Sequence, residues 1–450
     1  MSTTVEERVL EPQTRRRSQN ALIRVALVNM TVFSCVLGAN STLFLQGQGA
    51  SAAQVGLLGA VMGIGPLAQL LGLRMIQRLG KARTLRWGRI ALAASLAILA
   101  GLAALAWGGA GTIYLSMGVL ALVTACLHVG ETSWWPLLQD VTAGEPKGPF
   151  FSRMRSQLRV LEVLLPVGVG LYLGREPSTQ RFAVPFAVAA LGAVAGSHLA
   201  RRVSERPVIA RSVPLLAGLW NARRVTSVRR YGSFMFLYGF LLMALGRFWV
   251  VMLKDLGLGD GHIVWLTAVA AVGHVAGLRM WAWMVDNHGG RSTLSLTVAG
   301  PAAMGLAWLM LPSLGTSVWV VMGWAVAFHL LWGFFIGGSL MGRTQVMMDA
   351  VPEDCQADAF TLLNLITAMG GAIGSLVHGW LFEALGGRSA LGVDGRLWYL
   401  AGVQAASLGL WYHKVRLVGH DQQTPARRLV ATAARWALRR LRHRLLRWVR

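Results

Sequence analysis

The sequence predicts an all-α integral membrane protein with twelve transmembrane helices in two pseudo-symmetric six-helix bundles. Hydrophobic residues make up 54% of the 450 residues and charged residues only 14%, a balance that an ordinary soluble core does not accommodate. Apolar runs of about 20 residues, the length that crosses a bilayer, can be marked off twelve times. An Arg-rich segment, residues 201–230, separates two groups of six runs and is too polar to cross a bilayer.

These runs define the expected spans and domains. The first half has spans near residues 23–45, 55–76, 90–107, 113–134, 158–173 and 182–199. The second half has spans near residues 234–252, 263–285, 294–311, 318–340, 362–385 and 397–411. The chain therefore divides into an N-terminal tail (1–21), a first bundle (22–200), a basic linker (201–230), a second bundle (231–417) and a basic amphipathic tail (418–450).

The two halves carry the same landmarks at equal spacing. Gly80 is separated from Gly289 by the same number of positions as Asp140 is from Asp349. A constant offset at two separate places indicates a duplicated unit longer than a soluble solenoid repeat. Duplication of this kind is typical of transporters built from two membrane halves.

The distribution of basic residues predicts the topology. The net charge of +24 would suggest nucleic acid in a soluble protein, but here the cations lie between and after apolar runs, so we expect no nucleic-acid partner. With the N-terminus in the cytoplasm, the inside segments hold most of the Arg and Lys, including Arg89, Arg291 and Arg343, whereas the outside loop 108–111 holds none. The positive-inside rule then puts both termini in the cytoplasm. We expect a monomer in a bacterial inner (cytoplasmic) membrane, with anionic lipids at the basic face.

The C-terminal tail permits two interpretations. Apolar residues such as Val430, Ala434 and Leu438 recur three or four positions apart within residues 424–450, and Arg residues lie mostly off that stripe. One interpretation is a helix on the membrane surface that senses lipid headgroups or a partner. The other is a disordered basic tail that helps to set topology.

No motif points to a metal, a cofactor or catalysis. Cys35, Cys126 and Cys355 lack paired spacing, so neither a disulfide framework nor a zinc site follows. No Gly-rich loop ends in Gly-Lys-Ser/Thr, and no His-Glu-x-x-His occurs. ATP-driven transport and metal-dependent hydrolysis are therefore not indicated, and we do not expect an enzyme.

Two short motifs, together with the span count, resemble the major facilitator superfamily over residues 22–417. In that family the loops after the second and eighth spans carry an acid, a Gly and basic residues. The second copy here has Asp286, Gly289 and Arg291, and the first has Arg78, Gly80 and Lys81, with Gln77 where the acid is usual. An acid also ends the fourth and tenth spans, here Asp140 and Asp349. The physical logic is a turn that only Gly allows, beside a carboxylate that binds Arg and helix ends and latches one conformation.

The resemblance implies that the first, fourth, seventh and tenth spans line a central cavity. The cavity candidates on these spans are Asn29, Asn40, Tyr238, Arg247 and His329. Arg247 would hold an anionic group of a substrate, or else extend to the outer headgroups with Trp249 as an aromatic belt residue. His329, a single histidine on an apolar helix, is more often a packing residue than a ligand.

Ionisable side chains within spans are the candidates for proton coupling. Glu131 interrupts the fourth span, and a charge in hydrocarbon costs on the order of 3 kcal/mol, so its ionised form is disfavoured and it can exchange a proton. His128 lies one helical turn away on the same face and can share that proton. Glu162 in the fifth span is a further candidate. The competing interpretation is structural: Glu131 is solvated at the span's edge or pairs with an Arg of the fifth span, and Glu162 pairs with Arg155 or Arg159.

Together these features predict a secondary transporter that moves a small solute by alternating access, with proton coupling. The alternative is an assembly or scaffold protein with the same fold that binds partners through its basic linker and tail. A cavity with few fixed charges favours a neutral or amphipathic solute, whereas Arg247 favours an anion. The substrate is left open between the two.

Overall fold

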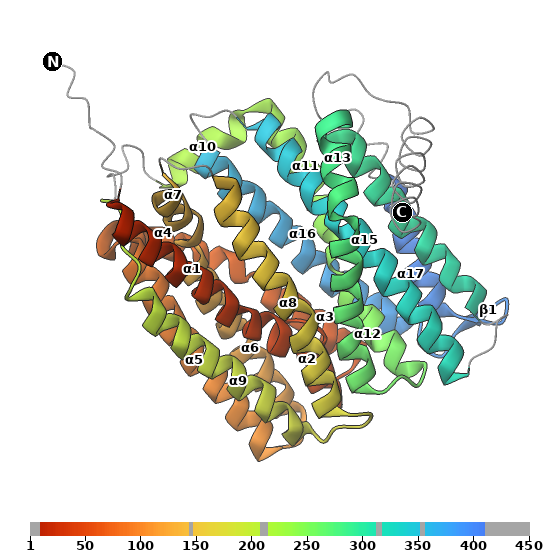
Figure 1. Ribbon diagram of the computed structural model, residues 1–450. Helices are drawn as coiled ribbons and strands as arrows, with labels where there is room; N and C mark the ends of the chain where they lie inside the picture. The colour runs from red at the N-terminus through yellow and green to blue at the C-terminus, as the bar shows by residue number, and fades with distance from the viewer. Residues whose placement is uncertain (1–9, 144–146, 208–214, 312–316, 352–355, 410–450) are drawn as a thin grey trace, which may run out of the picture. The chain divides into compact units, whose positions relative to one another are not determined.

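The computed structural model describes residues 10–143, 147–207, 215–311, 317–351 and 356–409 (Figure 1). The chain forms two compact units. Unit 1 comprises residues up to Ser212 with Leu253–Ala268 and Ser375–Trp380, and unit 2 comprises Val213–Met252, Val269–Gly374 and the remainder from Leu381. The tail predicted at 418–450 lies outside the described residues.

Helices dominate both halves of the sequence. The first half contains α1 (Pro12–Val32), α2 (Ala39–Gly47), α3 (Ala52–Gly63), α4 (Gln69–Leu79), α5 (Lys81–Leu105), α6 (Ala110–Glu131), α7 (Trp134–Thr142), α8 (Lys147–Leu173) and α9 (Ala183–Ala200). The second half contains α10 (Leu215–Arg224), α11 (Thr226–Tyr238), α12 (Gly246–Asp255), α13 (Asp260–Ala307), α15 (Val318–Ala350), α16 (Gln356–Ala384) and α17 (Gly395–Ala406). A two-stranded antiparallel hairpin, β1 (Ser389–Ala390) and β2 (Val393–Asp394), precedes α17.

Each of the twelve predicted spans has a helix in the structure. Ten helical segments of the described chain are long and apolar enough to cross a membrane. The segment Asp260–Met310 contains 51 residues and holds two predicted spans, because Gly289, at φ 76° and ψ 164°, interrupts helical geometry inside α13. The helix α17 is the described part of the twelfth span.

The first helix begins earlier than the sequence predicted. We expected a polar tail up to residue 21, but α1 starts at Pro12. Its polar first turns are buried against the end of α7: Arg15 donates to the carbonyl of Ala143 at 3.2 Å and Gln19 donates to that of Val141 at 2.9 Å. These hydrogen bonds satisfy carbonyls at the end of α7 and give a polar segment a reason to be helical.

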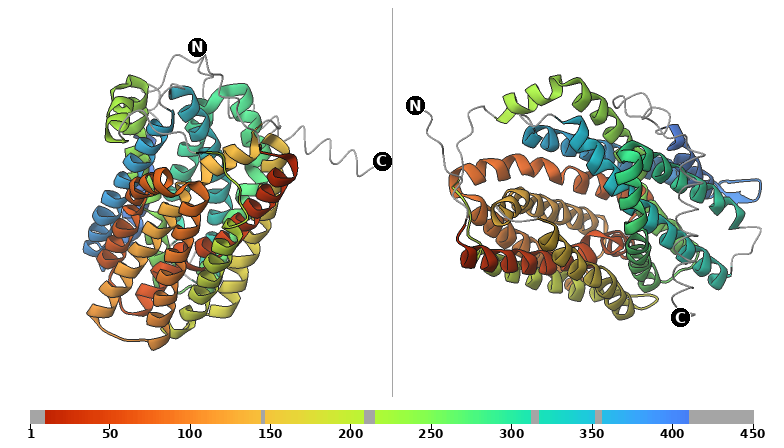
Figure 2. Two further views of the ribbon diagram at one scale, coloured as in Figure 1. Left: turned by 90° about the vertical axis from the view of Figure 1, so that its left-hand side faces the viewer. Right: turned by 45° about the horizontal axis from the view of Figure 1, so that its top comes forward.

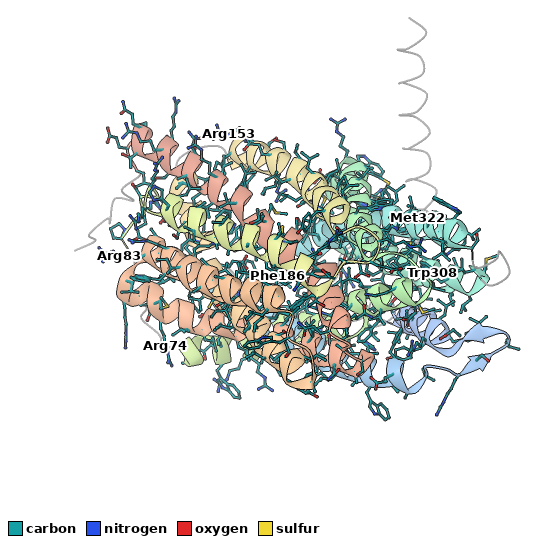
Figure 3. The ribbon with its side chains drawn as sticks, turned by 90° about the horizontal axis from the view of Figure 1, so that it is seen from below. Arg74, Arg83, Arg153, Phe186, Trp308 and Met322 are labelled. Carbon is teal, nitrogen blue, oxygen red and sulfur yellow. The ribbon has the colours of Figure 1, made fainter. Side chains whose placement is uncertain are left out.

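Close helix packing in unit 1 depends on aromatic residues and on glycine. Phe44 packs against Phe186 with ring centroids 5.1 Å apart, and Phe186 lies among the helices in Figure 3. The helices α1, α5, α6 and α9 run side by side (Figures 1 and 2). A Cβ at Gly88 on α5 would lie 2.7 Å from the Cα of Gly130 on α6. Because lipid tails are as apolar as Leu, such close backbone approach supplies the van der Waals contact that holds membrane helices together.

Unit 1 also includes the start of α13 and one turn of α16. The Asp260 N–H donates to the carbonyl of Arg175 at 2.9 Å, and the Gly261 N–H donates to that of Gly174 at 2.7 Å. A Cβ at Gly56 on α3 would lie 2.7 Å from the Cα of Gly379 on α16. The domain division expected from the sequence, with a linker at residues 201–230, put both of these segments in the second bundle instead.

Unit 2 has an aromatic core. Trp249 packs 4.9 Å from both Trp308 and Phe328 by ring centroids, and Trp308 is fully buried. Figure 3 shows Trp308 among the helices. Trp249 itself is only 3% exposed. The interpretation of Trp249 as a belt residue at the membrane surface is therefore wrong, because its ring is inside the protein.

Matching irregularities appear in the two halves. A π-helical turn, Phe33–Leu37, separates α1 from α2, and a second, Gly239–Met243, separates α11 from α12. These are the first and seventh spans. The turns before α5 and within α13 are also alike, because Gly80 has φ 90° and Gly289 has φ 76°, values that favour glycine. The internal repeat inferred from spacing thus extends to backbone conformation.

The predicted linker is partly helical. The helix α10 occupies Leu215–Arg224, and α11 begins at Thr226, before the boundary of residue 230 expected for the second bundle. The seventh span therefore starts with the basic residues Arg229 and Arg230. Polar residues in its first turns hid this start from a hydropathy criterion.

Candidate functional site

Glu131 and His128 form a pair at the end of α6. The His128 Nδ1 atom lies 3.5 Å from a carboxylate oxygen of Glu131, one turn along the helix, and the two side chains are 24% and 26% exposed. Within the described chain His128 Nδ1 makes no hydrogen bond, so the contact with Glu131 is electrostatic. The expected shared face is present, and α6 ends at Glu131 before α7 resumes at Trp134.

Arg89 joins this pair to the first span. It was expected in a cytoplasmic segment, but it lies within α5 and is only 2% exposed. Its guanidinium donates to the side-chain oxygen of Asn29 on α1 and interacts electrostatically with Glu131. Sequence reasoning therefore missed a buried cation that connects the cavity candidate Asn29 with the proton-coupling candidate Glu131.

Small residues make this arrangement possible. The close approach of Gly88 to Gly130 brings α5 and α6 together next to Arg89 and Glu131. A Cβ at Gly65 would lie 3.2 Å from the His128 ring, and one at Gly196 would lie 3.7 Å from the Cδ atom of Arg89. Larger side chains at these positions would push the ionisable groups apart.

The other candidates in unit 1 lie apart from this pair. Asn40 is 1% exposed, and its amide donates to the carbonyl of Ser34 at 2.7 Å across the π-helical turn. Glu162 pairs with Arg159 on the same face of α8. That contact is the structural pairing weighed against a coupling role for Glu162.

The first latch loop binds two carboxylates, Asp140, which the family pattern includes, and Glu205, which it does not. Lys81 contacts both oxygens of Asp140 at 2.9 and 2.7 Å, and its side chain is 12% exposed. Glu205 accepts the Ala82 N–H at 2.8 Å, and the Arg206 N–H donates to Asp140 at 3.1 Å. Asp140 and Glu205 thus supply negative charge at the loop in which Gln77 replaces the usual acid. Arg78, the other basic residue of this loop, is exposed.

The second latch loop is arranged differently. Asp286 is exposed, whereas Arg291 is 8% exposed at the start of the helical segment that follows Gly289. The Thr293 hydroxyl donates to the carbonyl of Gly289 at 3.1 Å and closes the first turn after the break. Asp349 belongs to α15, and its side chain lies outside the described set.

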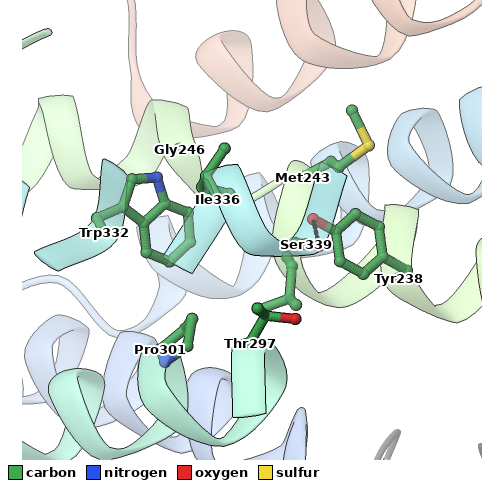
Figure 4. A pocket seen from close by; sticks show the side chains of 9 residues that line it. Tyr238, Met243, Gly246, Thr297, Pro301, Trp332, Ile336 and Ser339 are labelled. Atoms are coloured by element: carbon green, nitrogen blue, oxygen red, sulfur yellow. Dashed lines mark hydrogen bonds between the residues drawn. The ribbon is translucent and has the colours of Figure 1, made fainter. Parts of the chain in front are cut away.

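Unit 2 contains a cavity of about 240 Å³ beside the π-helical turn of the seventh span (Figure 4). Tyr238 and Ser339 point toward each other in it, with their hydroxyl oxygens 3.0 Å apart. Trp332 and Thr297 also line it, and so does Pro301, which cannot donate a backbone hydrogen bond to the carbonyl of Thr297. No lining residue is charged. The cavity therefore offers aromatic faces and hydroxyl groups.

A cation lies behind one wall of this cavity. The Arg343 guanidinium stands 4.4 Å from the centre of the Tyr238 ring, and the Tyr231 hydroxyl donates to the carbonyl of Arg343 at 3.0 Å. Arg343 was expected in a cytoplasmic loop, but it is a residue of α15. It orients Tyr238 through a cation–π contact without lining the cavity.

The remaining candidates of unit 2 do not line the cavity. Arg247 lies at the start of α12, next to the lining residue Gly246. The His329 Nδ1 atom is 2.8 Å from the carbonyl of Ala325 in its own helix, and its ring lies 5.5 Å from that of Phe328. This geometry favours a packing role for His329.

Comparison with known proteins agrees with this architecture. The family model described as Major Facilitator Superfamily matches residues 231–449. A structure of a mutant of the nucleoside transporter NupG aligns with a TM-score of 0.69 and 12% identity, covering 90% of this chain and 99% of that one. A D-xylose-proton symporter aligns with a TM-score of 0.66 and 13% identity, covering 90% and 97%. The second half of the chain, residues 231–449, is therefore similar to the major facilitator superfamily, and the chain shares the fold of these transporters.

The shared fold confirms the all-α membrane fold of twelve helices predicted from the sequence. The xylose transporter XylE from E. coli, in a partially occluded inward-open conformation, aligns with a TM-score of 0.62 and 13% identity, covering 89% of this chain and 98% of that one. The search of curated protein sequences found no match.

Proposed function

We propose that this protein is a secondary transporter of the major facilitator type that moves a small solute by alternating access and couples it to protons. Both termini face the cytoplasm of a bacterial inner membrane. The observation that carries the coupling is the contact of buried Arg89 with Asn29 of the first span and its electrostatic interaction with Glu131 of the fourth. Ionisable residues at membrane depth mark pathways, and here one links two spans that line the cavity in this family.

The coupling step takes place on the Glu131 carboxylate. When Glu131 is ionised, its charge offsets that of Arg89 and also attracts His128. When a proton binds the carboxylate, the positive charge of Arg89 is left uncompensated, at a cost on the order of 3 kcal/mol. Arg89 then shifts toward water or toward Asn29. Because Asn29 lies on α1, four residues before the π-helical turn, the protonation state of Glu131 biases the geometry of that span.

The substrate is a neutral solute with a ring and hydroxyl groups. The cavity of unit 2 supports this class because Tyr238 and Trp332 offer ring faces, and Tyr238 and Ser339 offer hydroxyl groups that both donate and accept. Its uncharged lining favours a neutral solute over the anion that Arg247 suggested. NupG and the xylose symporter, whose folds this chain shares, are by name transporters of solutes of this class.

Transport into proteoliposomes with an imposed pH gradient tests the proposal. A thermal-shift screen of nucleosides and pentoses first identifies the solute. We expect the wild type to accumulate it against its gradient, and Glu131→Gln to lose accumulation at least tenfold while keeping solute exchange. Glu162→Gln is the matched control, because Glu162 pairs with Arg159 on its own helix. Accumulation that ignores the pH gradient, or that survives Glu131→Gln unchanged, contradicts the coupling.

A further inference from the structure

Unit 2 contains a second hollow, which we call the basic groove. It lies between the end of α10, the start of α11 and the start of α16, with a volume of about 390 Å³. Arg223, Arg229 and Ser233 form its polar rim. Phe236, Ile366 and Met369 are among its apolar walls.

The groove changes from charged to apolar along the helix axes. On α11 its lining runs from Arg229 to Phe236, and on α16 from Leu362 to Met369. Seven residues along a helix correspond to about 10 Å. The two helices run in the same direction, because a Cβ at Gly232 would meet Ile366 at 3.1 Å, while the next contact pairs Phe236 with Gly370. The starts of the two helices therefore lie at the same end of the groove, next to Arg229.

Glycine closes the far end of the groove. A Cβ at Gly239 would lie 3.0 Å from the backbone nitrogen of Gly371, so the two helix backbones touch there. Toward the helix starts Ile366 and Leu362 hold them apart. Met369 is 50% exposed and Ser233 is exposed, so the hollow is open at its side and at its charged end.

The charged end of the groove lies at the start of a helical segment that is long and apolar enough to cross a membrane. Arg229 belongs to the first turn of a membrane-spanning segment, Thr226–Asp255. In the preceding helix Trp220 is 54% exposed, and the Arg223 guanidinium lies 5.2 Å from the centre of its ring. Exposed Trp and Arg at the end of a span are typical of the headgroup region. The apolar walls then extend from that level into the hydrocarbon.

We propose that the basic groove is a binding site for an acidic phospholipid. The phosphate of the lipid contacts Arg223 and Arg229 and accepts the Ser233 hydroxyl, and one acyl chain lies against Phe236, Ile366 and Met369. Charge complementarity supports this occupant, because the neighbouring Arg224 and Arg230 are also exposed. The carboxylate of Asp358 does not line the groove and packs against Gly218 of α10.

Native mass spectrometry of the purified full-length protein tests the site with phosphatidylglycerol and phosphatidylcholine of identical acyl chains. The double variant R223Q/R229Q removes both rim charges. R224Q/R230Q is the matched control, since it removes two exposed arginines from the same helices without touching the lining. We expect phosphatidylglycerol binding to fall roughly 25-fold in the first variant, because each arginine contributes about a factor of five near an anionic lipid. The control should change it less than threefold.

Two further measurements distinguish binding of a phospholipid from binding of a soluble phosphate. Met369→Trp fills the apolar wall and leaves both arginines in place, and we expect it also to weaken phosphatidylglycerol binding. Soluble glycerol phosphate, which carries the charge without acyl chains, should not bind at the same concentration. Equal binding of phosphatidylcholine, equal loss in the two double variants, or full binding of glycerol phosphate would each overturn the proposal.

Discussion

The ion pair between Lys81 and Asp140 provides a prediction that needs no substrate. Asp140 is 5% exposed and holds both the Lys81 ammonium and the Arg206 N–H. Asp140→Asn leaves the ammonium uncompensated in a largely buried place, which costs about 3–5 kcal/mol. We take the lower end because Lys81 is 12% exposed. About 3 kcal/mol lowers the melting temperature of a unit of about 200 residues by roughly 6–12 °C.

Thermal unfolding in detergent, followed by tryptophan fluorescence, measures this change. The double variant K81M/D140N removes both charges, so we expect it to recover at least half of the loss. Asp286→Asn is the control, because Asp286 is an exposed acid in the corresponding loop of the other half, and it should shift the melting temperature by less than about 2 °C. A melting temperature for Asp140→Asn within 1–2 °C of the wild type would refute the reasoning.

Three further predictions concern packing, binding and capping. Gly88→Ala should destabilise the protein by about 1–3 kcal/mol, because the added Cβ meets Gly130. Gly101→Ala on the same helix is the control and should be neutral or stabilising, since nothing lies within 4 Å of its added Cβ. Thermal unfolding measures both changes. Tyr238→Phe should weaken solute binding about fivefold by losing one hydrogen bond worth about 1 kcal/mol, measured by calorimetry. Glu205→Gln should cost about 0.5–1 kcal/mol by weakening the cap on α5, visible as a lower denaturant midpoint.

The sequence predicted the spans well because each depends on a local property. Twenty apolar residues in succession are a signal that no distant contact alters. The glycines at positions 80 and 289 were recognised for the same reason, since a turn with positive φ selects glycine locally. Helix starts rich in polar residues, such as Pro12 and Thr226, were missed because tertiary contacts rather than hydropathy make them helical.

The contacts of the site could not be predicted in this way. Arg89 lies next to an apolar run, so a rule based on charge alone assigned it to topology. A signal was nevertheless present: Leu85, Leu92 and Leu96 are fully buried and lie four, three and seven residues from it, so Arg89 shares their buried stripe. Its partner Asn29 comes from another helix, α1, and the two helices are brought together by α9, which packs against both.

The internal repeat also shows how the two halves differ. At the spacing that relates Gly80 to Gly289, Asn29 corresponds to Tyr238 and Arg89 to Val298. Asn29 and Arg89 are hydrogen-bonded in unit 1, whereas Tyr238 and Val298 both belong to an apolar cluster of unit 2. The side chains at these positions are therefore charged and polar in unit 1 but aromatic and aliphatic in unit 2. Glu131 and His128 correspond to Leu340 and Gly337, which cannot carry a proton. This difference in chemistry supports the proposal that unit 1 binds the proton and unit 2 binds the solute.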